Sequence, residues 1–315
     1  MEELVADADR MGRIRDFAWK AGPDLPAHVA TYPSMLSSIE RRMLRWLAAE
    51  HYTGRGAICD LGAFLGGSTI ALAEGVRAGG HTGKVIHSYD WHRISERSWE
   101  QWEPAISRPY PESGKFLSVT RELMGDLADL VEFHSGDFSQ MPPPQSEIEI
   151  LFVDIAKVFA TSDHIVRNFL PKLIPGQSVV IQQDYFHVWP PFDVYVMEVL
   201  HDHFEPLAFA KTSALFINVR AVDSAAVESA LSRNMSIETL RGALEAAAGR
   251  WPQEQGAHVE RILRSLDGLD RAPQTKRILR RTTKGGLTLA ERAEKAKWRA
   301  KRRRRKALRG LRSRD

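Results

Sequence analysis

Residues 59–73 read CDLGAFLGGSTIALA, and this stretch decides the fold class. A short apolar run at 57–62 leads through a glycine-rich turn into a helical stretch at 68–79. Glycines let a backbone approach a ligand closely, and the free amides of a helix N-terminus favour a polar or anionic group. The spacing D-x-G-x-x-x-G-G-S differs from the G-x-G-x-x-G dinucleotide fingerprint. The stretch therefore predicts a strand–turn–helix unit, which either binds a ligand or packs a helix tightly on a sheet.

Strands and helices alternate on the C-terminal side of this unit. Further strands are expected at 84–90, 131–137, 148–154 and 175–184, and helices at 115–130, 160–173 and 192–204. Strands at 205–211 and 213–220 meet tightly around Thr212, which predicts an antiparallel pair. This alternation predicts a doubly wound, Rossmann-like α/β fold with a mainly parallel seven-stranded sheet, an antiparallel last strand and a C-terminal helical extension.

The chain divides into four predicted parts. They are an N-terminal lead at 1–31, a sheet domain at 32–222, a helical extension at 223–283 and a basic tail at 284–315. The sheet domain opens with a helix expected from Met35 to about Tyr52. The extension holds helices expected at 236–251, with Ser236 as N-cap, and at 255–269.

Charge is distributed unevenly along the chain. The 44 Lys plus Arg and 40 Asp plus Glu give a net charge of +4. Residues 284–315 hold 14 basic and 3 acidic side chains, or +11, so the rest of the chain carries −7. The tail is either a solvated helix, a contact for an anionic membrane surface or a nonspecific nucleic-acid contact. Trp298 is its one aromatic residue, which disfavours base stacking.

Cys59 is the only cysteine of the chain. A single cysteine excludes an internal disulfide and a cysteine-cluster metal site, and the apolar sequence around Cys59 predicts a buried thiol. The N-terminus shows no secretory signal, and no run reaches the ~18 apolar residues of a membrane-spanning helix. We expect a cytoplasmic protein, peripheral to the inner membrane face if the tail binds that surface.

Acidic side chains recur where the predicted strands end. Asp90, Asp137, Asp154 and Asp184 end the second to fifth strands, and Asp60 lies close to the end of the first. Open α/β sheets bind ligands outside the carboxyl ends of their strands, so this series predicts a site there. A carboxylate at Asp90 can accept both hydroxyls of a ribose, and Asp137 is suitably placed for an adenine amino group. A single strand-end Asp is often only a helix cap, so the series carries the prediction.

These motifs give the chain from about 32 to 220 a family resemblance. It resembles the class I S-adenosylmethionine-dependent methyltransferases, within them the macrocin/mycinamicin O-methyltransferase and cephalosporin-hydroxylase-type group, and more distantly the caffeoyl-CoA type. The matching segments are DLGAFLGGS (60–68), SYD (88–90), SGDF (135–138), FVDIAK (152–157), IQQDY (181–185) and LAFAKTSALFINV (207–219). Their order is more specific than any one of them.

The resemblance implies S-adenosylmethionine as the cofactor and assigns residues to its parts. The residues expected along its methionine portion are Gly62, Ala63, Gly66 and Ser68, with Asp60 near the amino group. The residues expected around its nucleoside are Asp90 at the ribose and Trp91, Asp137 and Phe138 at the adenine. Trp91 and Phe138 alternatively serve only to pack the top of the sheet.

The chain departs from the metal-dependent relatives at two motifs. They usually show D-G-x-H after the fourth strand, whereas residues 154–157 here are Asp-Ile-Ala-Lys. They carry an acidic pair after the fifth strand, and this chain has Gln183-Asp184. Asp154 and Asp184 are the two remaining carboxylates, and Mg²⁺ needs few protein ligands, so a Mg²⁺ site at these two residues stays open.

Methyl transfer to an alcohol requires an aligned acceptor and either a base or a metal. The candidate catalytic residues are Lys157, Asp154 and His187, and His92 is a further histidine near the expected crevice. Lys157 acts as the base if burial lowers its pKa, and otherwise forms an ion pair with Asp154. The aromatic segment 91–114, with Trp189 and Phe192, forms either a wall for a sugar ring or flat aglycone, or a packed lid or dimer contact.

The expected function is O-methyl transfer from S-adenosylmethionine to a hydroxyl of a sugar, glycan or secondary metabolite. One alternative is a non-catalytic Rossmann-like cofactor-binding module that acts through its basic tail, which the departures at Lys157 and Gln183 keep open. A second alternative is a nucleic-acid methyltransferase. The expected partners are a small-molecule or glycan acceptor, an anionic membrane surface through residues 284–315, and a second copy in a homodimer.

Overall fold

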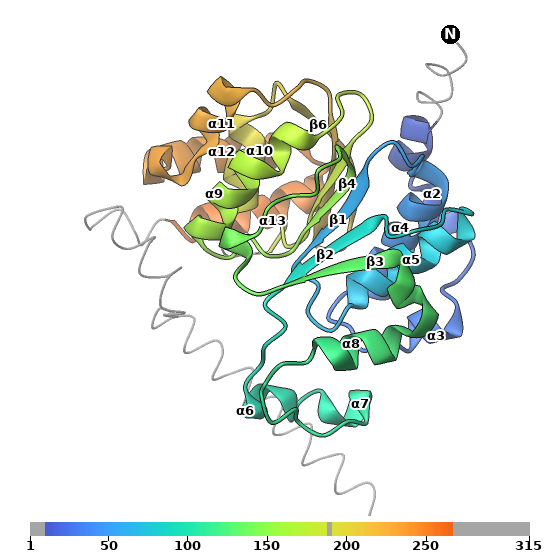
Figure 1. Cartoon of the computed structure of the whole chain (residues 1–315). Helices are drawn as coiled ribbons and strands as arrows, with labels where there is room; N and C mark the ends of the chain where they lie inside the picture. Colours follow the sequence, from blue (N-terminus) through green and yellow to red (C-terminus); the bar gives the residue numbers. More distant parts are fainter. Residues whose placement is uncertain (1–9, 188–190, 267–315) are drawn as a thin grey trace, which may run out of the picture. The chain divides into compact units, whose positions relative to one another are not determined.

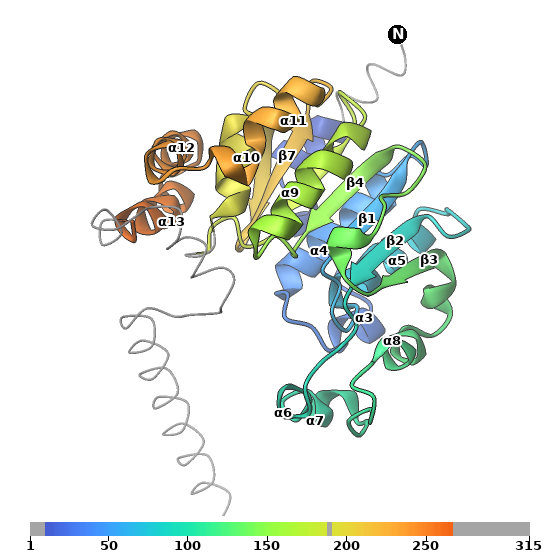
Figure 2. The same ribbon diagram turned by 60° about the vertical axis from the view of Figure 1, so that its left-hand side comes forward.

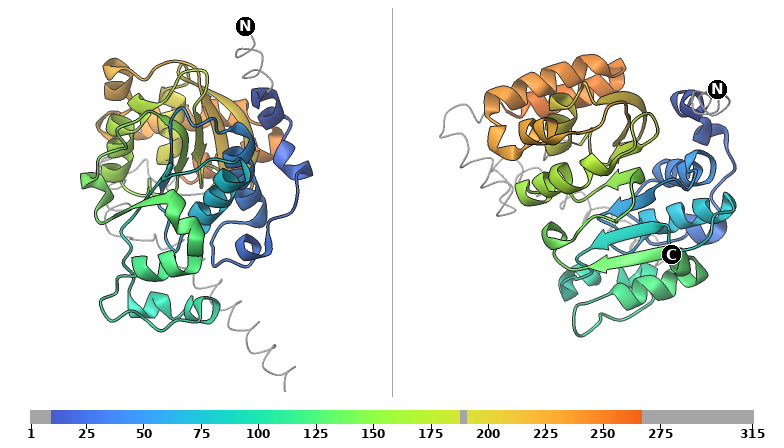
Figure 3. Two further views of the ribbon diagram at one scale, coloured as in Figure 1. Left: turned by 45° about the vertical axis from the view of Figure 1, so that its right-hand side comes forward. Right: turned by 45° about the horizontal axis from the view of Figure 1, so that its top comes forward.

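A seven-stranded sheet forms the centre of the computed structural model, which describes residues 10–187 and 191–266. The strand order is β3-β2-β1-β4-β5-β7-β6, and β7 runs antiparallel to both of its neighbours while the other pairs are parallel. The right-hand view of Figure 3 shows β2 and β3 running in the same direction. The strands are β1 (Ala57–Leu61), β2 (Ile86–Asp90), β3 (Val131–Ser135), β4 (Ile148–Val153), β5 (Val179–Gln182), β6 (Phe204–Ala210) and β7 (Ser213–Asn218). This topology confirms the predicted fold class.

Helices cover both faces of the sheet (Figure 1). Helices α4 and α5 lie on one face and α9 and α10 on the other, with α12 packed against α10 and α13 against α12 (Figure 2). The helices are α2 (Ala18–Ala21), α3 (Ala27–Ala30), α4 (Ser38–Trp46), α5 (Gly67–Ala78), α6 (Glu96–Trp99), α7 (Glu103–Ile106), α8 (Leu117–Met124), α9 (Phe159–Asn168), α10 (Phe192–Val199), α11 (Ser224–Ala230), α12 (Ile237–Arg250) and α13 (Gln253–Arg264). A π-helical turn, Leu47–His51, continues α4.

The main core lies between the sheet and the α4–α5 layer. Strand residues such as Ile58 and Ile150 are fully buried with helix residues such as Leu44 and Ile70. Burial of each such side chain stabilises the fold by about 2 kcal/mol relative to exposure. Cys59 is also fully buried, which confirms the predicted buried thiol.

The helix predicted from Met35 begins three residues later, at Ser38. The Ser37 hydroxyl accepts a hydrogen bond from the Glu40 amide, and the Glu40 carboxylate accepts one from the Ser37 amide. This reciprocal capping box fixes the start of α4. Met35, expected on the apolar face of the helix, instead lies before it and is 69% exposed.

Other predicted helices are present but end earlier in the chain than predicted. The helix expected at 160–173 ends at Asn168, and the chain continues as a 3₁₀ turn that contains Pro171, which cannot donate an amide to an α-helix. The helix expected at 192–204 ends at Val199. Ser236 caps α12 as predicted, with Thr239 completing the capping box.

The described residues reach only part of the predicted extension. The basic tail at 284–315, residues 267–283 and Trp189 lie outside them. Over residues 10–187 and 191–266, no helix combines the length and the hydropathy needed to cross a membrane.

Candidate active site

A cavity of about 620 Å³ opens beyond the carboxyl ends of β1, β2, β4 and β5. Ligands of open α/β sheets bind at this place, and the volume lies within the range of small-molecule sites. Its described lining carries four carboxylates and two ammonium groups, so the formal charge is −2; the residues are Glu40, Asp90, Asp154, Asp184, Lys157 and Lys211. Such a surface favours a ligand with a net positive charge.

The turn after β1 brings its backbone against the backbone that follows β4. Gly62 has a φ of 101°, and a Cβ at this residue would lie 2.9 Å from the carbonyl carbon and oxygen of Asp154. Both the conformation and the close approach therefore require glycine. Gly62 lines the cavity, whereas Gly66 is enclosed by Tyr32, Thr120 and Met124.

Residues 33–36 lie over the glycine-rich turn. With Ala63 and Ser68 they bound a space of about 20 Å³ beside the cavity, and a Cβ at Gly67 would overlap the Ser34 side chain. This space has room for about one water molecule and is far smaller than the main cavity. The methionine contacts of Ala63 and Ser68 stay predictions.

Asp90 ends β2 and faces the cavity. Its carboxylate accepts hydrogen bonds from the amides of Phe64, at 2.9 Å, and His92, at 2.7 Å. These bonds fix the carboxylate relative to the glycine-rich turn. Each carboxylate oxygen keeps a further lone pair, so Asp90 can still accept two hydroxyl groups. The geometry suits the predicted ribose contact.

Lys157 joins the two acids that follow β4 and β5. Its Nζ lies 2.9 Å from Oδ1 of Asp154 and 2.8 Å from Oδ2 of Asp184. Burial raises the pKa of Asp154 to about 6, against the opposing charge of Lys157. Burial on its own lowers the pKa of Lys157, but the charges of Asp154 and Asp184 outweigh it and raise this pKa. The direction opposes Lys157 as a general base and supports the ion pair.

Asp60 is fully buried beneath the first turn of α5 and does not line the cavity in the described structure. Its carboxylate accepts hydrogen bonds from Oγ of Ser68, at 2.9 Å, and Oγ1 of Thr69, at 2.6 Å. Burial raises the pKa of Asp60 to about 7, although these hydroxyls favour the ionised form. Asp60 thus fastens β1 to α5.

The residues predicted around the adenine lie outside the described cavity lining. Asp137 is exposed, and it accepts hydrogen bonds from the Ser139 amide and hydroxyl, which caps the turn at 138–140. Phe138 is 3% exposed and packs against Tyr89 with 5.8 Å between ring centroids. Trp91 is 51% exposed. Asp137 and Phe138 therefore have structural roles here, and their adenine contacts stay predictions.

The aromatic segment 91–114 forms a small core of its own. Helices α6 and α7, which lie beside α8 in Figures 1 and 3, bury Trp99 and Ile106 together with Leu65 and Phe116. Phe64 lines the cavity and contacts Trp102 of this segment, with 5.3 Å between ring centroids. The aromatic-wall interpretation is therefore wrong for Trp99 and also for the buried Phe192.

Neither predicted histidine lines the cavity within the described residues. His187 is exposed, and its amide donates to the carbonyl of Asp184. His92 is 1% exposed, its ring packs against Phe116 and Phe133, and burial lowers its pKa. A base role for either histidine gains no support from these positions.

Three further polar groups lie near the cavity, and two of them, Glu40 and Asp193, were not predicted from the sequence. Glu40 is 2% exposed and accepts hydrogen bonds from the hydroxyls of Thr212 and Ser213, which joins α4 to the β6–β7 turn. The S-x-x-E spacing at 37–40 was the available signal for it. Oε1 of Gln183 is buried with no hydrogen-bond partner among the described residues. Asp193 of α10 is 8% exposed, and burial raises its pKa to about 8.

Comparison with known proteins gives one sequence match and several structural similarities. Residues 59–185 match the sequence profile of a family described as a methyltransferase domain. No curated protein matches the chain. Similar solved structures include the O-methyltransferase NovP, at 19% identity and a TM-score of 0.47, covering 59% of this chain and 82% of that one.

Two further structures show comparable similarity. One is the Podospora anserina methyltransferase PaMTH1 bound to SAH, at 15% identity and a TM-score of 0.42, covering 68% of this chain and 95% of that one. The other is CalS11, a TDP-rhamnose 3′-O-methyltransferase of calicheamicin biosynthesis, at 14% identity and a TM-score of 0.45, covering 67% and 93%.

The matched segment contains the turn at Gly62 and the strand-end residues Asp90, Asp154, Lys157 and Asp184, so it supplies most of the charged groups of the cavity. The family implies S-adenosylmethionine as the methyl donor, and the net negative lining suits that cationic molecule. Residues 59–185, about two fifths of the chain, thus match a methyltransferase domain, and the protein is an S-adenosylmethionine-dependent methyltransferase.

Proposed function

We propose that this methyltransferase acts on oxygen, with a hydroxyl of a sugar, glycan or secondary metabolite as the acceptor. The observation that carries the proposal is the arrangement after β4 and β5, where Lys157 bridges Asp154 and Asp184 at the cavity. Oε1 of Gln183, which has no hydrogen-bond partner within residues 10–187 and 191–266, adds an acceptor beside them. A hydroxyl both donates and accepts a hydrogen bond, so it pairs with groups of both kinds.

The two ends of the cavity have different tasks. When bound, S-adenosylmethionine supplies an electrophilic methyl group on its sulfonium sulfur. Gly62 and Asp90 hold the donor at the end formed by β1 and β2. At the other end Asp154, with a pKa of about 6, accepts the hydroxyl proton, because a base works best with a pKa near the operating pH. The Lys157 ammonium stabilises the negative charge that develops on the acceptor oxygen.

A divalent metal does not fit between Asp154 and Asp184 as these residues stand. The Lys157 ammonium already lies within 3 Å of both carboxylates, has no lone pair for a metal and repels a second cation. The Mg²⁺ prediction for these two residues therefore requires Lys157 to move away. We propose that Lys157 supplies the positive charge and that the reaction proceeds without Mg²⁺.

Methyl transfer by the purified full-length protein tests the acceptor class. The protein is incubated with S-adenosylmethionine carrying an isotopic label and with a panel of glycosides, nucleotide sugars and RNA. We expect label on a hydroxyl oxygen of a glycoside or sugar. Mass spectrometry of metabolites and surface polysaccharide from a deletion strain should show a species that lacks one methyl group. Transfer to nitrogen or to RNA contradicts the proposal.

The role of Lys157 is tested with Lys157→Met and, as a matched control, Lys84→Met at an exposed lysine. Removing one group that stabilises a developing oxyanion lowers kcat by about 10²–10³-fold. We expect this loss in Lys157→Met, with the affinity for S-adenosylmethionine retained, and no loss in the control. EDTA should leave the wild-type rate unchanged. A rate that falls with EDTA and returns with Mg²⁺ excludes this role of Lys157.

A further inference from the structure

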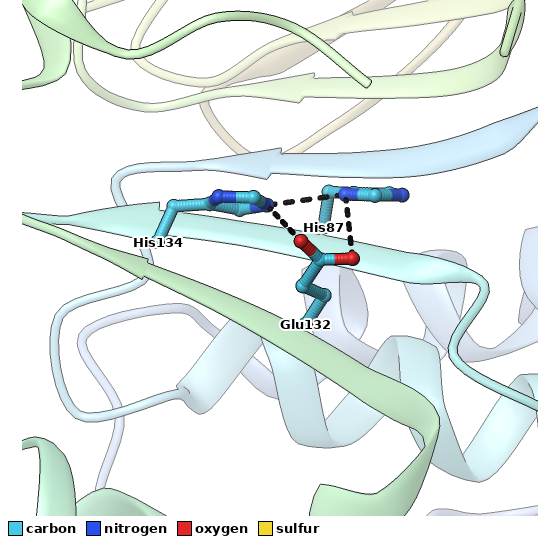
Figure 4. A group of neighbouring side chains, drawn as sticks. All are labelled: His87, Glu132 and His134. Carbon is cyan, nitrogen blue, oxygen red and sulfur yellow. Dashed lines mark hydrogen bonds and ion pairs between the residues drawn. The ribbon is translucent and has the colours of Figure 1, made fainter. Parts of the chain in front are cut away.

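A second group of metal-ligating side chains lies in the sheet, apart from the methyl-transfer cavity. His87 belongs to β2, while Glu132 and His134 belong to β3, the edge strand of the described sheet. The parallel register places His87 opposite Glu132 and Tyr89 opposite His134. Because alternate residues of a strand share a face, the three side chains come together on one face of the sheet (Figure 4).

The donor atoms of this cluster have the spacing of metal ligands. Nδ1 of His87 lies 3.1 Å from Nε2 of His134. The Glu132 carboxylate oxygens lie 3.8 Å from Nδ1 of His87 and 3.7 Å from Nε2 of His134. Ligands held at about 2.0–2.1 Å from a tetrahedral Zn²⁺ lie roughly 3.3 Å from one another. The three distances in the structure bracket this value.

Packing holds one of the two imidazoles in place. The Tyr89 ring stacks on the His134 ring with 4.2 Å between centroids and 10° between planes. The Tyr89 hydroxyl donates a hydrogen bond to the carbonyl of Pro142. A metal-ligating side chain fixed in this way loses little conformational freedom when it binds an ion, which favours metal binding.

A cavity of about 470 Å³ adjoins the cluster and gives an ion access to it. Its other wall is the segment 142–146, which begins with three successive prolines. Proline has a backbone carbonyl but no N–H group, so this part of the wall offers hydrogen-bond acceptors and no backbone donors. The cavity therefore suits a cation, and it has room for a water molecule as a fourth ligand.

We propose that His87, Glu132 and His134 bind a divalent transition-metal ion of the Zn²⁺ type. Two imidazole nitrogens and one carboxylate suit Zn²⁺, Co²⁺ or Ni²⁺, whereas Mg²⁺ prefers an all-oxygen set. The ion links the edge strand β3 to β2 and stabilises the folded protein, because it binds the folded state preferentially. Binding here is independent of the proposed acceptor.

Calorimetric titration of the untagged, chelator-treated full chain with Zn²⁺ tests the site. We expect one saturable equivalent, a higher Tm and no comparable binding of Mg²⁺. Titration with Co²⁺ should give the visible absorption of a site with nitrogen and oxygen ligands and no thiolate charge-transfer band. Failure of Zn²⁺ to bind saturably, or equal binding of Mg²⁺, overturns the proposal.

Two variants test the ligands, and a third serves as the control. Changes to groups around a metal cost about 10–100-fold in affinity, so Glu132→Gln and His134→Asn should each weaken Zn²⁺ binding at least ~10-fold. The Glu132 side chain is 52% exposed, so its variant should keep the fold if His134→Asn does not. His201→Asn, at a histidine 50% exposed beside Asp202, should bind Zn²⁺ like the wild type. Unchanged affinity in Glu132→Gln, or lost affinity in His201→Asn, refutes the assignment.

Discussion

Replacing Asp60 with asparagine is expected to stabilise the protein at and above neutral pH. Asp60 is fully buried, and burial raises its pKa from 3.8 to about 7 despite hydrogen bonds from Thr69 and Ser68. The folded state therefore binds the Asp60 proton more tightly than the unfolded state does. The free energy of unfolding falls as the pH rises between these two pKa values, because the folded state binds this proton more tightly and loses it at a greater cost than the unfolded state does. An asparagine has nearly the same shape and carries no charge, so the Asp60→Asn variant should not lose stability in this way.

The size of the effect follows from the pKa. Each pKa unit corresponds to roughly 1.4 kcal/mol, so the rise from 3.8 to about 7 means that ionising Asp60 costs the folded state ~4 kcal/mol. Wild type and Asp60→Asn should have similar free energies of unfolding near the lower pKa. Wild type should then lose up to ~4 kcal/mol relative to the variant by about one pH unit above the higher pKa. The raised pKa of Asp193 acts in both proteins and cancels in the difference, whereas the charge of Asp154 helps to raise the pKa of Asp60 and is part of the effect.

Urea unfolding followed by circular dichroism, repeated at several pH values across this window, measures the difference. Asp137→Asn serves as the control, because Asp137 is exposed and no comparable pH-dependent gain is expected from it. A difference between wild type and Asp60→Asn that does not change with pH would refute the reasoning. So would a variant that loses stability relative to wild type as the pH rises.

Three substitutions test other parts of the fold. Gly62→Ala should destabilise the protein by about 1–3 kcal/mol in urea unfolding and weaken S-adenosylmethionine binding, because its positive φ and close approach to another backbone exclude a Cβ. Glu149→Gln should lower the Tm and cost about 1.5–3 kcal/mol, since the buried Glu149 carboxylate accepts hydrogen bonds from three backbone amides within residues 53–56. Ser37→Ala should cost about 1 kcal/mol in the same measurement through loss of the α4 cap, whereas Ser37→Thr should retain most of the stability. A Ser37→Ala variant as stable as wild type would show that the Glu40 contacts alone hold the start of this helix.

Local pattern was enough to predict the sheet and the place of the site. The alternation of apolar runs with helical stretches predicted a mainly parallel sheet, which the structure contains. The structure also confirms the antiparallel hairpin around Thr212. The run before Gly62 and the acids at Asp90, Asp154 and Asp184 predicted a site at the carboxyl ends, where a cavity lies. These features are readable because hydrophobic period and turn residues act over a few neighbouring positions.

Which acids face the cavity was decided by tertiary structure. Asp60 and Asp137 fit the same strand-end pattern as Asp90, yet one is buried under α5 and the other caps a turn. Their orientation depends on how each strand end packs against the next helix or turn, which a strand-end pattern does not encode.

Contacts between distant residues had no local signal at all. Lys157 contacts Asp184, 27 positions away, in addition to the neighbouring Asp154 that was its predicted partner, and Glu40 accepts a hydrogen bond from Ser213. His87 and His134 meet only through the register of β2 and β3. The sequence by itself thus determined which elements form and in what order, because those depend on neighbouring residues. Only the folded chain decided which charged and metal-ligating groups share a site, because register and packing join residues that are far apart in sequence.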